Sequence, residues 1–224
     1  MNWFGELRAW IGARRRQRVA VDEVLEGEIT SRRTLRCAEY LPQVDKVALR
    51  QTVCAFAEWA FDLPASEAHH DARPFGLFEH SLEVSEIAVR TACIEDLAPQ
   101  FGVAAWVIGL FHDVGKLAMV RVSGPGALWN PYIEPLVAFY SRHGRNRCEV
   151  EWVSGRCRRD SWNWPTPMLM GRILPGAMAA VMGPTLLTDL LERRTPEVER
   201  VAAIAAGADH LAVRQAMRGR RSSS

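Results

Sequence analysis

The sequence lacks the features of a membrane protein and of a disulfide-bonded one. It has no uninterrupted apolar run of about 18 residues, which a membrane-spanning helix needs, so we predict no membrane span. Its N-terminus does not show the charged, apolar and small-residue order of a signal peptide. The 5 cysteines are scattered and form no C-x-x-C pair. An odd number without paired spacing indicates reduced thiols, so we expect a cytoplasmic protein.

The composition is typical of a folded protein with a single core. The 224 residues are 48% hydrophobic and 24% charged, with a formal net charge of +2. We predict a basic amphipathic segment at 1–20, a helical domain at 21–217 and a polar tail at 218–224. The sequence leaves open whether the first segment is a solvated helix or docks on a partner protein, acidic lipid or nucleic acid.

A pair of ionisable side chains directly follows an apolar helical run. The run at 103–111 is followed by His112 and Asp113, and then by Gly115 and Lys116. Burying a histidine and an aspartate without partners costs about a few kcal/mol for each group. A metal ion or a tight polar network would offset that cost, and this stretch favours a metal.

The preceding helix supplies a second histidine. A helix is predicted over 76–95 with His80 in its first turns, and the next helix begins near Pro99. If the two helices are antiparallel, the chain climbs roughly 22 Å from His80 and returns roughly 21 Å to His112. His80, His112 and Asp113 would then converge as nitrogen and oxygen ligands suited to Zn, Fe or Mn.

A fourth candidate ligand lies in the last predicted helix. Asp209 interrupts an alanine-rich apolar pattern, and aspartate is unfavourable inside a helix and rarely buried unless it is paired. The sequence therefore predicts an all-α bundle with Asp209 turned inward. The helices are expected at 42–61, 76–95, 99–112, 131–143, 168–174, 184–192 and 198–218, and a small β-hairpin is expected at 148–156.

Further residues are candidates for binding a phosphate or a second metal. His69 and His70, in a polar loop, would hold a second metal or contact a phosphate, unless the loop is only a solvated connection. Arginine matches phosphate oxygens well. The basic candidates for substrate contact, which would otherwise be a solvated rim, are Arg156, Arg158, Arg159 and His143.

The ordered set of His80, His112-Asp113 and Asp209 resembles the HD superfamily of metal-dependent phosphohydrolases. A narrower resemblance, from about 41 to 217, is to the TraI-type HD domain of conjugative relaxases, the MobH class. The segments that carry it are 63–67, 69–70, 76–84, 149–152 and 172–175. The resemblance implies an HD-domain helical bundle, a divalent metal (Mn, Fe, Zn or Mg) and metal-assisted cleavage of a DNA phosphodiester. In that reaction, Lys116 would stabilise charge on a phosphate, and Asp113 would also orient the attacking water. It also implies DNA and a protein of the conjugation machinery as partners.

Two other functions remain open from the sequence. The family pattern has a histidine after the predicted hairpin, and residues 160–164 contain none. This difference favours a catalytically impaired HD scaffold that binds DNA, a nucleotide or a protein. The other alternative is a small-nucleotide phosphohydrolase, which would share the metal site and differ in its substrate. A further possibility is a helical domain in which these polar residues form a network in the core and have no catalytic or binding role.

Overall fold

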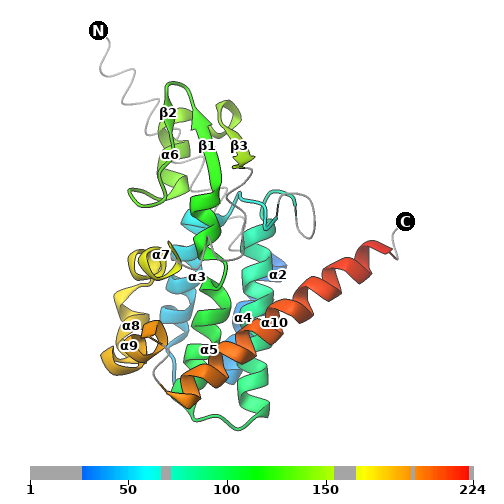
Figure 1. Ribbon diagram of the computed structural model, residues 1–224, viewed down its shortest axis with the longest axis vertical. Helices are drawn as coiled ribbons and strands as arrows, with labels where there is room; N and C mark the ends of the chain where they lie inside the picture. The colour runs from blue at the N-terminus through cyan, green and yellow to red at the C-terminus, as the bar shows by residue number, and fades with distance from the viewer. Residues whose placement is uncertain (1–26, 67–71, 154–164, 193–194, 222–224) are drawn as a thin grey trace.

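The computed structural model describes residues 27–66, 72–153, 165–192 and 195–221. Within these ranges, helices form most of the structure, and a small antiparallel sheet lies at the upper end in Figure 1. The predicted fold class, mainly helical with a small β insertion, is confirmed.

Two antiparallel helices lie at the centre of the helical part. They are α4 (Gly76–Ile94) and α5 (Pro99–Phe111), joined by the short connection 95–98. Pro99 lies in the first turn of α5, where its missing N–H is not needed. Most of α5 is buried and apolar on every side, as expected for a helix inside a core. The predicted helical hairpin and its boundaries are confirmed.

The two central helices approach each other closely at Gly109. A Cβ atom on Gly109 would lie 2.7 Å from Ser85 Cα and 3.0 Å from Ser85 N. Atoms do not approach so closely without a shift of the backbone, so the contact requires glycine. His112 follows three residues later in the chain. The glycine contact therefore controls how near His112 comes to α4.

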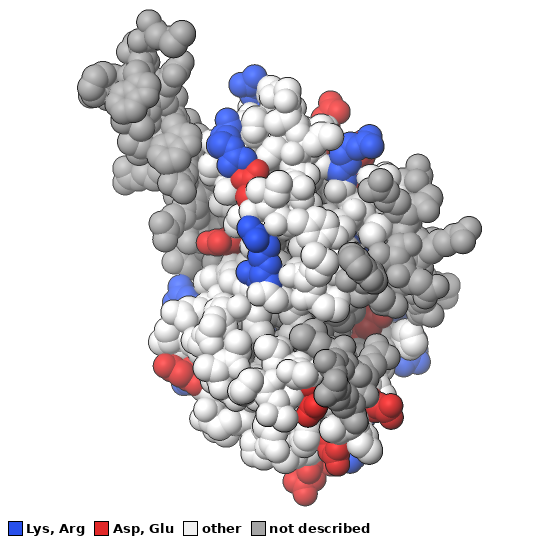
Figure 2. Space-filling model, turned by 60° about the vertical axis from the view of Figure 1, so that its left-hand side comes forward, with Lys and Arg blue, Asp and Glu red and all other residues white. Residues whose placement is uncertain are grey.

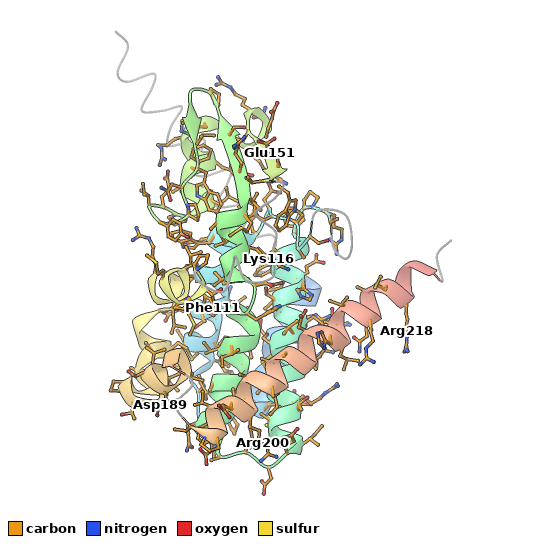
Figure 3. All side chains as sticks on the ribbon, viewed as in Figure 1. Phe111, Lys116, Glu151, Asp189, Arg200 and Arg218 are labelled. Carbon is orange, nitrogen blue, oxygen red and sulfur yellow. The ribbon has the colours of Figure 1, made fainter. Side chains whose placement is uncertain are left out.

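The long helix α10 (Pro196–Arg221) crosses α4 and α5, with Arg200 near one end and Arg218 near the other (Figure 3). Val201 and Ala208 of α10 are buried in an apolar cluster shared with α4 and α5. The helix continues past the predicted start of the polar tail at 218, which corrects that boundary. The added residues are Arg218, Gly219, Arg220 and Arg221, and the three arginines are good helix formers that outweigh the one glycine.

Helix α2 (Glu28–Tyr40) packs beside α4 and was not predicted from the sequence. Its sequence has many charged residues, and its buried positions include Thr30 while Leu35 is exposed, so no apolar stripe marks the helix. In the structure, these charges contact another helix. Arg33 Nη1 and Arg36 Nε lie 2.8 and 2.7 Å from the Glu86 carboxylate of α4.

Helix α3 (Lys46–Ala60) begins four residues after Pro42, the residue expected in its first turn. The start is set by Asp45, whose side chain accepts a hydrogen bond of 2.9 Å from Val47 N. An aspartate at this position satisfies a backbone N–H that has no partner inside the helix. The cap therefore decides the boundary.

The sheet has the strand order β2-β1-β3, with β1 (Val120–Gly124) in the middle. Strand β2 (Ala127–Leu128) and strand β3 (Glu149–Trp152) both pair with it in antiparallel fashion. Strand β3 is predicted correctly. Its observed partner β1 was not expected, and the predicted turn at 154–156 lies outside the described residues. The partner is β1 because Val120 and Val122 alternate with polar residues and bury one face of that strand.

Helix α6 (Leu136–His143) begins later than the predicted start near 131. Pro135 precedes it with an extended ψ of 148°, so the helix cannot include the residues before it. The remaining elements are η1 (Val114–Met119), η2 (Arg145–Arg147), α7 (Pro165–Ile173), α8 (Gly176–Met182) and α9 (Pro184–Glu192). The sequence predicted α9 correctly and missed α8.

One segment of the described chain is long and apolar enough to cross a membrane. It spans Pro99–Met119, with a mean hydropathy of 1.3, and 78% of it is buried inside the fold. The core helix of a folded protein meets the same criterion of length and composition. Because this segment contains α5, burial against its neighbours accounts for its hydropathy.

The packing at Gly109 leads to a stability prediction. Gly109→Ala would force α4 and α5 apart and lower the free energy of unfolding by about 1–3 kcal/mol, the usual cost of overpacking. The measurement is urea denaturation followed by circular dichroism. The matched control is Gly207→Ala, where a Cβ meets nothing within 4 Å. That change should leave stability equal or raise it by up to about 1 kcal/mol. Equal midpoints for Gly109→Ala and the unmodified protein would contradict the packing argument.

Candidate metal centre

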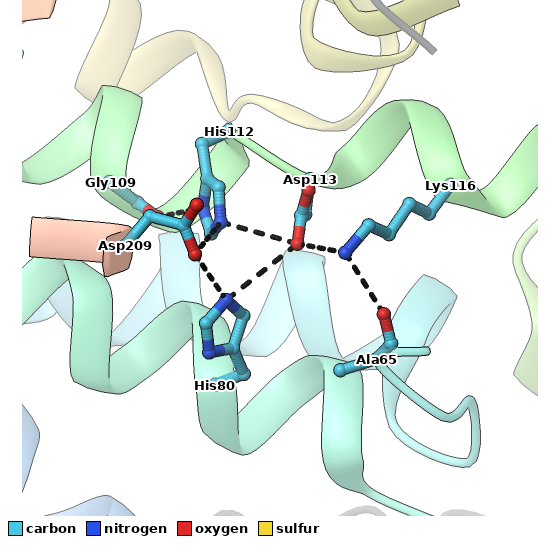
Figure 4. A network of polar contacts seen from close by, with 7 residues as sticks. All are labelled: Ala65, His80, Gly109, His112, Asp113, Lys116 and Asp209. Carbon is cyan, nitrogen blue, oxygen red and sulfur yellow. Dashed lines mark hydrogen bonds and ion pairs between the residues drawn. The ribbon is translucent and has the colours of Figure 1, made fainter. Parts of the chain in front are cut away.

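Three side chains, from α4 and from the two residues that follow α5, meet at one point (Figure 4). His80 lies in the second turn of α4, His112 follows the last residue of α5, and Asp113 comes next. One ligand atom from each residue lies within 4.8 Å of the other two. His80 and Asp113 are buried, and His112 is partly buried. The predicted convergence of these three residues is therefore observed.

Asp209 reaches the same point from α10. Its Oδ1 lies 3.1 Å from His80 Nε2 and 3.7 Å from His112 Nε2. On the other side, Asp113 Oδ2 lies 3.2 Å from His112 Nε2 and 3.7 Å from His80 Nε2. Each histidine nitrogen thus lies between two carboxylate oxygens. Neighbouring ligands bound to one divalent ion at about 2.1 Å are roughly 3 to 3.5 Å apart, so these distances fit a metal site.

The orientation of His112 also suits a metal ligand. Its Nδ1 is 2.8 Å from Gly109 O, which can only accept a hydrogen bond, so Nδ1 carries the proton. The Nε2 lone pair is then available to a metal ion. Among the described residues, this buried Nε2 has no hydrogen-bond partner, although Asp113 lies close to it. A buried nitrogen left in this state is satisfied by a cation placed between the two carboxylates.

The carboxylates of Asp113 and Asp209 favour positive charge next to them. Burial would lower the pKa of His112, but the carboxylates of Asp113 and Asp209 outweigh it and raise that pKa to about 10. Burial would raise the pKa of Asp113, but His112 and Lys116 hold it well below its usual range. The pKa of Asp209 is also lowered, against burial, by its contacts with the two histidines. Without a metal, the carboxylates therefore favour a proton on His112 Nε2, and a divalent cation bound there would take the place of that proton.

Lys116 contacts the protein itself rather than open solvent. It lies in the 3-10 helix η1, and its side chain is buried. Its Nζ is 2.5 Å from Asp113 Oδ2 and donates a hydrogen bond of 2.9 Å to Ala65 O. The expected contact of Lys116 with a phosphate stays a prediction.

Of the other predicted site residues, the structure describes only His143, which lies away from this cluster. His69 and His70 lie outside the described residues, as do Arg156, Arg158 and Arg159. His143 lies at the end of α6, where its ring centroid is 4.5 Å from that of Phe139. Its side chain also lies against Gly124 of β1, so it belongs to the sheet region.

A second buried polar cluster was not predicted from the sequence. Asp62, just after α3, accepts hydrogen bonds from Tyr140 Oη at 3.0 Å and from Arg145 Nε at 2.9 Å. Burial and the Asp62 charge raise the pKa of Tyr140. Because 78 residues separate Asp62 from Tyr140 along the chain, no local pattern could have revealed the contact. The cluster joins the end of α3 to α6 and η2.

Comparison with known families gives one match. Residues 41–220 match the TraI_2 family, which carries the description "Putative helicase". The chain belongs to the TraI_2 family. Comparison with curated proteins and with solved structures gave no significant match. The TraI_2 region includes all four clustered residues, and membership supports a helicase- or relaxase-like function linked to conjugative transfer.

The geometry of the centre predicts bound metal. Protein dialysed against a metal-free buffer and reloaded should hold about one equivalent of a divalent transition metal, because four nitrogen and oxygen donors converge. His80→Ala and Asp113→Ala should each lose it, as measured by elemental analysis. His143→Ala removes a histidine outside the cluster and should keep it. Retention of metal by both cluster variants would show that the ion binds elsewhere.

Proposed function

We propose that this TraI_2 domain is a metal-dependent phosphohydrolase of the HD type, which cleaves a DNA phosphodiester during conjugative transfer. The observation that carries the proposal is the convergence of two imidazole nitrogens and two carboxylate oxygens from three helices. The family match supports the link to conjugation. Hydrolysis is favoured because a histidine and carboxylate centre of this kind suits phosphoryl chemistry.

The four clustered residues, His80, His112, Asp113 and Asp209, would hold a divalent cation (Mn, Fe, Zn or Mg). Such an ion polarises a phosphoryl oxygen and lowers the pKa of water when bound. His80 is closed to solvent, with 1% of its side chain exposed, whereas Asp209 is 30% exposed. A substrate phosphate would therefore arrive at the Asp209 edge of the site.

Asp113 would have two tasks. Its lowered pKa keeps the carboxylate ionised near neutral pH, so it can bind the cation. An ionised carboxylate also accepts hydrogen bonds and can orient a water molecule for attack on phosphorus. Because Asp113 is buried, any water that it orients would be held between protein groups.

Basic side chains near the sheet support DNA as the substrate. Figure 2 shows Lys and Arg on the upper part of one face, which carries the sheet and α6 in Figure 1. Arg121 and Arg142 are paired with Glu151 and Glu134, so part of this charge is compensated within the protein. Arg147 is exposed in the same region. Arg156, Arg158 and Arg159, the arginines of the predicted basic patch, lie outside the described residues.

A binding module without hydrolysis is the second candidate. It is favoured by the lack of a histidine in residues 160–164, where the resemblance to the relaxase domains leads us to expect one. Such a module would keep the metal as a structural element and would bind DNA, a nucleotide or a conjugation protein. Hydrolysis that depends on the clustered residues would exclude it.

Metal-loaded protein should hydrolyse single-stranded DNA or a chromogenic phosphodiester. His112→Ala and Asp113→Asn should lower kcat/KM by about a hundredfold or more, because each variant loses a group that positions charge at phosphorus. The matched control is Arg200→Gln, which removes an exposed contact with Glu95 and should leave the rate unchanged. Equal rates for all variants would trace the hydrolysis to a contaminant. Faster turnover of nucleotides than of DNA would reassign the substrate.

Binding to DNA should depend on salt. If arginines neutralise backbone phosphates, the dissociation constant for a single-stranded oligonucleotide should rise steeply between about 50 and 200 mM salt, through release of counterions. Fluorescence anisotropy measures this, with Arg147→Gln expected to reduce the slope. A dissociation constant independent of salt would argue against phosphate contacts.

A further inference from the structure

We infer that Lys116 is a positioning residue, whose ammonium group fixes Asp113 Oδ2 toward the two histidines and ties it to the chain segment 63–65. The inference rests on the proposed metal centre and assigns Lys116 a different task from contact with a phosphate. Three observations carry it: the local helix type, the contacts of one oxygen atom, and the anchoring of Ala65.

The 3-10 conformation places Lys116 beside Asp113. Residues three apart in a 3-10 helix lie one above the other, and η1 begins directly after Asp113. An α-helix would separate the two side chains by a larger angle. The Nζ atom of Lys116 therefore lies 2.5 Å from Asp113 Oδ2, the carboxylate just before η1.

The oxygen held by Lys116 is the one that faces the histidines. Asp113 Oδ2 is 3.2 Å from His112 Nε2 and 3.7 Å from His80 Nε2. Figure 4 shows the histidines on one side of this atom and Lys116 on the other. An ammonium group in this place selects which carboxylate oxygen points into the site and keeps the carboxylate from rotating.

The second contact of Lys116 joins the site to another part of the chain. Nζ donates to Ala65 O, and Ala65 is fully buried. The same segment is fixed to the first turn of α4, because Leu77 N donates to Leu63 O at 2.9 Å. Lys116 thus links Asp113, through residues 63–65, to the helix that carries His80.

These contacts argue against a direct role on the substrate. The side chain of Lys116 is 10% exposed, so it is largely enclosed. Two of its three N–H donors are used by Asp113 and Ala65, and freeing the one on Asp113 would separate a buried ion pair, which is costly. Removing a group that orients a metal ligand usually lowers metal affinity by about 10- to 100-fold. We expect a loss of metal affinity of this size when the ammonium group of Lys116 is removed.

The test is titration of the metal-free protein with Co²⁺, followed by its visible absorption. Lys116→Met should weaken Co²⁺ binding by about tenfold or more and change the absorption bands, because Asp113 loses its fixed orientation. The affinity of the Co²⁺-loaded protein for inorganic phosphate, measured by calorimetry, should stay within about twofold. The matched control is Lys46→Met, which removes the exposed lysine at the start of α3 and should change neither quantity.

The opposite pattern would overturn the inference: unchanged Co²⁺ binding together with a large loss of phosphate affinity. Lys116→Arg, which keeps the charge and the donors, should restore most of the Co²⁺ affinity. If Lys116→Met does not fold, Lys116→Arg provides the test. A folded Lys116→Arg protein that binds Co²⁺ normally but binds phosphate more weakly would also overturn the inference. Failure of the unmodified protein to bind Co²⁺ would overturn the metal centre and this inference together. Metal binding without hydrolysis would overturn only the proposed reaction.

Discussion

The close contact between α4 and α5 is the constraint on which the candidate site depends. At Gly109 the backbone of α5 lies against the backbone of Ser85, and this contact leaves no room for a Cβ atom. The same helical hairpin carries His80 on one arm and His112 at the end of the other. Their ring centroids are 5.2 Å apart, a distance that a wider helix pair would not allow. Apolar burial around α5 supports this arrangement, because the helix has no polar face that would draw it to the surface.

The polar groups at the end of this hairpin contact one another and differ in how exposed they are. His80 and Asp113 are buried, His112 is directed by the carbonyl of Gly109, and Asp209 closes the cluster from the more exposed side. The pKa values of Asp113 and Asp209 are both lowered, so these carboxylates favour positive charge beside them. Buried charges are costly unless they are paired or bind a metal ion, and four nitrogen and oxygen donors at one point suit a metal ion. This supports a metal centre over a polar network with only a structural role.

Much of the site could be predicted from the sequence, because its residues stand out locally. His112 and Asp113 follow an apolar run, Asp209 interrupts an alanine-rich helix, and Pro99 marks the start of α5. Constant rise along a helix then places His80 opposite His112. The start of α3 was missed because it depends on the Asp45 cap. The partner of β3 was missed because strand pairing joins segments that are far apart in the chain.

The sequence by itself determined the helical class, the central hairpin and the identities of the four convergent residues, since each follows from local periodicity or from an ionisable group in an apolar setting. Only the tertiary structure decided how Lys116 is used. Its contacts with Asp113 and with Ala65, 51 residues earlier, depend on the 3-10 conformation of η1 and on the path of the segment before α4. The same holds for the cluster of Asp62, Tyr140 and Arg145, which packing brings together. Long-range contacts of this kind depend on how the helices pack. The local pattern of residues along the chain does not predict them.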